Sequence, residues 1–89
     1  MTAGERRTIE LSIPMDGDRE REALEQALLR ARASELAEVR RSQVRLDAGY
    51  GDATTRDSMT GEASRAQLRW TMLDRLLTAI RAESNAREV

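Results

Sequence analysis

The side chains that can do chemistry in this chain are carboxylates and guanidinium groups. The sequence contains no histidine or cysteine, and all 15 of its basic residues are arginine. The usual general base, thiolate nucleophile, zinc ligands and Schiff-base amine are therefore missing. Acid–base work by Asp or Glu, binding of hard cations and attraction of anions by Arg remain. From this inventory we expect a protein that is not an enzyme and has no catalytic residues, no cofactor and no metal site.

The acidic residues include two E-x-x-E spacings, Glu22 with Glu25 and Glu35 with Glu38. Such pairs on two facing helices can bind Mg²⁺ through their oxygens. Here both pairs fall on one predicted helix, about 120–140° apart around its axis. The predicted second helix offers Asp74 alone. The pairs are therefore interpreted as a solvent-exposed charged face.

Length and composition favour association with another chain. The protein has 89 residues, 39% of them apolar, and no phenylalanine. Chains this short bury only about 60–65% of their unfolded surface, so a core built mostly from Leu and Ala is thin. We therefore expect a homodimer, together with binding to another protein.

The charge pattern bears on partners and location. Charged residues of both signs are interspersed and make up 35% of the chain, with a net charge of −1, so no broad field for nucleic acid or membrane is indicated. No signal peptide and no apolar run approaching the ~20 residues of a membrane span is present, and we expect a cytoplasmic protein without membrane contact. The exclusive use of arginine is interpreted as the codon bias of a GC-rich, bacterial genome. A surface that grips carboxylates or phosphates bidentately is the alternative.

The chain divides into three parts. Residues 1–7 are predicted to be a flexible terminus. Residues 8–14 (TIELSIP) alternate apolar and polar side chains, which predicts a short β-strand that pairs with a second copy or a partner, or else an extended arm lying on helices. Residues 15–89 are predicted to form a helical hairpin.

The hairpin is expected to have a helix at about 19–48, a loop at 49–60 and a second helix at about 61–83. Apolar residues recur on both helices at the spacing of a coiled-coil-like seam. The fold class is therefore all-α: an antiparallel helical hairpin that dimerises into a four-helix bundle. The predicted seam, which serves as core or dimer surface, consists of Leu24, Leu28, Ala31, Val39, Leu46, Ala66, Trp70, Leu73, Leu77 and Ile80. A neighbouring strip of the second helix contains Leu68, Met72, Leu76 and Ala79.

Glu35 and Ser42 interrupt the seam of the first helix. One interpretation is that they are buried polar groups that fix the register of the helices by bonding across the bundle. Their candidate partners are Arg65, Arg69 and Arg75. The other interpretation is a polar pocket in the bundle core that binds a small anionic ligand.

The predicted loop is longer than the two to eight residues that a helix–helix connection needs. Excess length at a rigid tip is typical of binding loops. Its aromatic, charged and flexible side chains, Tyr50, Arg56, Asp57 and Met59, are therefore the candidate partner-binding residues.

These features favour a small, non-catalytic interaction or regulatory module that acts as a homodimer. The alternative is a DNA-binding regulator or antitoxin whose paired strands present Thr8, Glu10 and Ser12 to a groove, as ribbon–helix–helix proteins do. The long first helix and the acidic residues beside the strand argue against that alternative, because phosphates would meet carboxylates. Nucleic acid is therefore a possible partner but not the favoured one.

Overall fold

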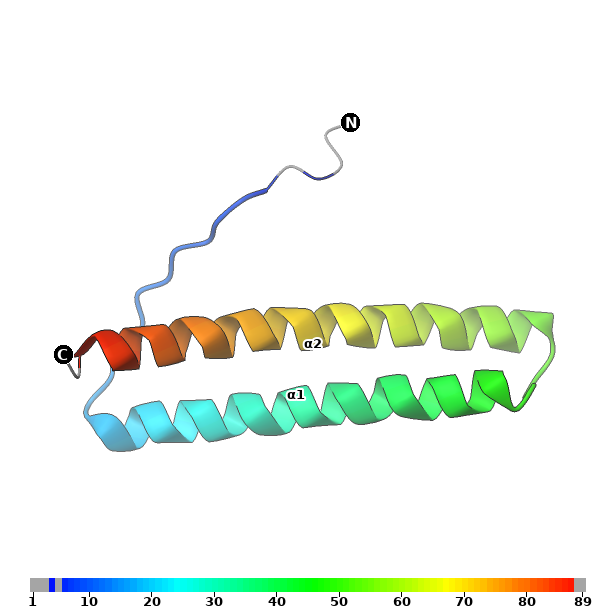
Figure 1. Ribbon diagram of the computed structural model, residues 1–89, viewed down its shortest axis with the longest axis horizontal. Helices are drawn as coiled ribbons and strands as arrows, with labels where there is room; N and C mark the ends of the chain where they lie inside the picture. The colour runs from blue at the N-terminus through cyan, green and yellow to red at the C-terminus, as the bar shows by residue number, and fades with distance from the viewer. Residues whose placement is uncertain (1–3, 5, 88–89) are drawn as a thin grey trace.

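The computed structural model describes Gly4 and residues 6–87, and these form an all-helical hairpin. Helix α1 spans Asp18–Asp47 and helix α2 spans Ala53–Arg87. The two helices run antiparallel and side by side over their whole length (Figure 1). The radius of gyration of 17.4 Å exceeds the roughly 12 Å of a compact domain of this length, so the molecule is elongated. The predicted antiparallel helical hairpin is confirmed.

The ends of helix α1 lie within a residue of those predicted, because local signals specify both. At the start, Glu20 Oε1 accepts a hydrogen bond from the Asp16 backbone N–H at 3.2 Å. At the end, Gly49 adopts a φ of 72°. The backbone N–H of Tyr50 donates to Arg45 O, and that of Gly49 donates to Leu46 O. This is the Schellman arrangement, which satisfies the last carbonyls of a helix and requires a left-handed residue where Gly49 stands.

The predicted loop at 49–60 is corrected by the structure: α2 begins at Ala53. Asp52 Oδ1 accepts a hydrogen bond from the Thr55 backbone N–H at 2.8 Å, as an N-cap does. The polar run 54–60 is therefore the solvated first part of a helix. Its Thr and Ser residues have modest helix propensity, which made the run resemble a loop. Helix α2 also continues to Arg87, past the predicted end at residue 83.

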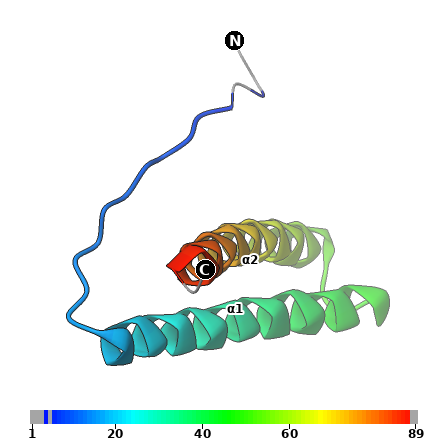
Figure 2. The same ribbon diagram turned by 60° about the vertical axis from the view of Figure 1, so that its left-hand side comes forward.

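The N-terminal segment, for which the sequence predicted a strand paired with another chain or an extended arm, is an extended arm in the single chain. Residues 6–15 have no regular secondary structure, because a strand needs a neighbour for its backbone groups and the described part of the chain supplies none. The arm stands away from both helices in two views (Figures 1 and 2). Of the predicted flexible terminus, residues 1–3 and 5 lie outside the described residues.

The core of the hairpin is small. Among the described residues, the buried apolar side chains are Met59, Ala66 and Leu77 on α2, while Ser42 on α1 is the buried polar one. Ala66 and Leu77 belong to the predicted seam, and the other eight seam residues are half-buried. Two helices cannot enclose each other's apolar faces fully, because each presents an apolar stripe wider than one neighbour covers.

Candidate functional site

Arginine side chains link the two helices along the whole hairpin. At the open end, Arg21 donates to Ser84 Oγ, and in the middle Arg32 pairs with Asp74 at 2.5 Å. Arg69 reaches from α2 to Glu35 on α1. At the tip, Arg56 Nη2 donates to the Leu46 carbonyl at 3.0 Å. The planar guanidinium group suits this work, because its several fixed donors bond carboxylate, hydroxyl and carbonyl oxygens across a helix interface.

Glu35 and Ser42 are polar residues of α1 that are partly or fully buried in the hairpin. The Glu35 side chain is partly buried and pairs with Arg69, one of the three arginines that the sequence offered as partners. Arg32 on α1 pairs with Asp74 on α2, which lies a little more than one turn beyond Arg69. Both arginines that reach across this region are thus already neutralised by carboxylates. This geometry fixes helix register, and it leaves neither cation free for a small anion.

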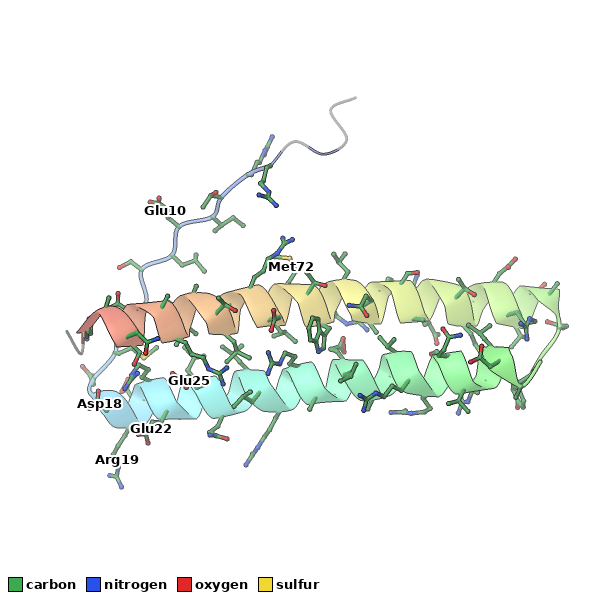
Figure 3. The ribbon with its side chains drawn as sticks, viewed as in Figure 1. Glu10, Asp18, Arg19, Glu22, Glu25 and Met72 are labelled. Atoms are coloured by element: carbon green, nitrogen blue, oxygen red, sulfur yellow. The ribbon has the colours of Figure 1, made fainter. Side chains whose placement is uncertain are left out.

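The E-x-x-E carboxylates do not converge. Glu25 lies 3.8 Å from Arg21, and Glu38 lies 3.2 Å from Arg41, both on their own helix. Glu22 points away from α2 into solvent (Figure 3). No group of three acidic side chains that could hold a metal ion occurs in the described part of the chain. Glu25 and Glu38 thus form ion pairs within α1, Glu35 pairs across to α2, and of the four carboxylates only Glu22 is exposed.

The tip does not present the four candidate binding residues together. Tyr50 is 62% exposed and Asp57 is exposed, whereas Met59 is 7% exposed and packs inside the hairpin. Arg56 is half-buried, and its bond to Leu46 satisfies a carbonyl in the last turn of α1, where a cation also suits the helix dipole. Because helix α2 begins earlier than predicted, Arg56 and Met59 stabilise the hairpin and are not free to bind a partner.

Asp52 is the titratable group at the tip whose environment changes its proton affinity. The hydrogen bond from the Thr55 backbone N–H, followed by that from the Thr55 hydroxyl, lowers the pKa of its carboxyl below the ordinary value of 3.8. The charged form is favoured because the N-terminus of α2 carries a partial positive charge. The carboxylate therefore acts as a helix cap.

A groove lies at the opposite, open end of the hairpin. The arm and the ends of both helices enclose this groove of about 660 Å³. Its floor is apolar and its rim carries charges that are paired within each helix, among them Arg87 with Glu83 at 2.6 Å. The groove is lined by Ile9, Leu11, Ile13, Leu24, Leu76 and Ile80, among other residues. The sequence indicated the apolar strip of the second helix and offered an arm lying on the helices, whereas the structure has the arm border the groove without packing on either helix.

Apolar side chains flank this groove without cover. On the arm, Ile9, Leu11 and Ile13 are 79%, 68% and 51% exposed. On α2, Leu68 and Met72 are exposed, and Met72 projects away from α1 toward the side on which the arm lies (Figure 3). Clustered exposed apolar side chains mark surfaces that bind other macromolecules.

Comparison of the chain with models of protein families, with curated proteins and with solved structures finds no match. Neither described helix contains an apolar stretch long enough to cross a membrane. Of the exposed large apolar residues among those described, Ile9, Leu11, Ile13 and Met15 line the groove.

Proposed function

We propose that this chain is a non-catalytic protein-interaction module of the cytoplasm that acts as a homodimer. The observation that carries the proposal is the exposure of apolar side chains on the arm and on the outer strip of α2, which is the strip that contains Leu68 and Met72. The small core supports it, since two helices with so few buried apolar residues gain stability by packing against further helices. A four-helix arrangement of two hairpins would cover the outer strip.

The mass in solution tests the homodimer. Sedimentation equilibrium of the chain should give twice the chain mass of 10.0 kDa at micromolar concentrations. Leu68→Glu and Met72→Glu should shift the equilibrium toward the single chain, because a carboxylate in an apolar interface is costly. Glu62→Gln, at an exposed position of the same helix, is the matched control. A fully helical single chain at every concentration would contradict the proposal.

Binding of another protein is tested at the tip. Tyr50 is exposed at the end of a rigid hairpin, and exposed tyrosines are frequent anchors in interfaces. A protein that co-purifies with the tagged chain from its native host should be lost with Tyr50→Ala and retained with Asp57→Asn. Retention with both variants would exclude the tip as the binding surface.

A further inference from the structure

We propose that the homodimer is held by its arms: residues 6–16 pair antiparallel with the same residues of a second copy, with the two-fold axis at Leu11. The inference rests on the proposed homodimer and specifies its interface. It starts from the observation that the arm is extended, alternates in polarity and has no strand beside it among the described residues. A second copy supplies a matching strand by symmetry.

The alternation gives the arm two different faces. Odd positions place Ile9, Leu11 and Ile13 on one side, and all three line the groove against the helices. Of the even positions, Thr8 and Glu10 do not line the groove, whereas Ser12 lies at its edge, and Glu10 points away from both helices (Figure 3). The apolar side chains of the arm therefore border the groove but remain exposed in the single chain, as one face of an unpaired strand would be.

Charge complementarity favours a register centred on Leu11. With Leu11 opposite Leu11, each Ile9 faces an Ile13 and each Glu10 faces a Ser12 on the partner arm. The same register places each Arg6 opposite an Asp16, so an ion pair forms at both ends of the ribbon. Shifting the axis to residue 10 would instead place Glu10 opposite Glu10, and like charges directly opposite are destabilising.

Pro14 agrees with this register. Residues of an antiparallel pair alternate between those that exchange hydrogen bonds and those that do not. When Leu11 exchanges hydrogen bonds with Leu11, residues 9 and 13 do so as well, and residues 8, 10, 12 and 14 direct their backbone groups outward. Pro14 has no N–H and therefore removes nothing from the ladder.

The groove provides what a two-stranded ribbon lacks. Such a ribbon is marginal in water on its own and needs packing against a helix. Leu24, Leu76 and Ile80 line the groove on the side opposite the arm, and the groove of about 660 Å³ leaves room for side chains of a second strand. Arm pairing would therefore cover the exposed apolar residues of the arm and the half-buried apolar side chains of the groove.

Cysteine cross-linking tests the register, because the natural chain has no cysteine to interfere. Facing residues that do not exchange hydrogen bonds have Cα atoms about 4.5 Å apart, within disulfide range, whereas diagonal neighbours lie about 7–8 Å apart. A mixture of Glu10→Cys and Ser12→Cys chains should therefore shift mostly to mixed cross-linked dimer under mild oxidation. Neither variant alone should do so. Val44→Cys, at an exposed position on α1, is the control for random collision.

A charge exchange provides a second measurement. Arg6→Asp or Asp16→Arg alone should weaken the dimer about two- to tenfold, because each removes two exposed ion pairs and creates repulsion. The double variant Arg6→Asp/Asp16→Arg should restore the original dissociation constant.

The outcomes separate this inference from the proposed function. Mixed cross-linking with charge rescue supports arm pairing. Efficient cross-linking of Glu10→Cys with itself would overturn the Leu11 register. A dimer mass without enrichment of the mixed cross-link would overturn arm pairing and leave the homodimer standing. A single-chain mass at all concentrations would overturn both.

Discussion

The guanidinium group of Arg32 on α1 lies over the indole ring of Trp70 on α2, 5.9 Å from the ring centroid, while it pairs with Asp74 one turn further along α2. One side chain thus makes a cation–π contact and an ion pair with the same neighbouring helix. Both contacts lie near the middle of the hairpin. Trp70, the only tryptophan of the chain, therefore lies at the helix interface, and its fluorescence can report formation of the hairpin.

This double contact predicts unequal costs for its two charged partners. Arg32→Ala should lower the free energy of unfolding by about 1–2 kcal/mol, since it removes both interactions. Asp74→Ala should cost about 0.5–1 kcal/mol, because the contact with Trp70 persists. Urea titrations followed by Trp fluorescence and circular dichroism measure both values. Equal losses for the two variants would show that the cation–π contact contributes nothing.

We predict that shortening a buried side chain of α2 lowers the stability of the hairpin. Leu77 is 1% exposed, so Leu77→Ala should destabilise the hairpin by about 2–5 kcal/mol through lost burial and a cavity. Leu68→Ala at an exposed position of the same helix should change stability by about 0.5 kcal/mol or less in dilute solution. Thermal unfolding at low protein concentration measures the melting temperatures of the two variants. Similar melting temperatures for the two variants would contradict the described packing of Leu77.

The connection between the helices contains two glycines with different surroundings. Gly49 and Gly51 both have positive φ, which costs an alanine about 1 kcal/mol at either position. A Cβ at Gly51 would also lie 2.8 Å from Thr55 Cγ2, whereas one at Gly49 meets open space. Gly51→Ala should therefore lower the melting temperature more than Gly49→Ala does. Adding Thr55→Ser, which removes the clashing methyl group, should recover part of the difference, and no recovery would argue against the clash.

The cap at Asp52 predicts a pH dependence of stability. Its pKa is lowered in the folded chain by the Thr55 hydrogen bonds, so the charged cap stabilises the hairpin at pH values above the ordinary 3.8. That contribution falls away as the pH drops through the folded-state pKa. Asp52→Asn keeps an acceptor oxygen but does not titrate. The advantage of the natural chain over this variant in melting temperature should therefore shrink on acidification from about pH 6 to about pH 2. A difference that is constant with pH would show that the charge of Asp52 does not stabilise α2.

The sequence alone determined the helical hairpin and the limits of helix α1, because these depend on interactions between residues close in the chain. Apolar spacing marks the helix faces, and Gly49 terminates α1 whatever the rest of the molecule does. The predicted interruption of the seam at Glu35 also came from spacing. Its partner among three arginines, Arg69, was decided by the register of the two helices.

Only the tertiary structure determined the conformation of the tip and the presence of the groove at the open end. The sequence could not tell whether residues 53–60 were loop or helix, since Thr and Ser suit both, and the cap at Asp52 resolved the choice. The burial of Met59 followed from that earlier helix start. The groove at the open end depends on where the arm leaves α1 relative to the last turns of α2. These are distances between residues far apart in the chain, and no local pattern encodes them.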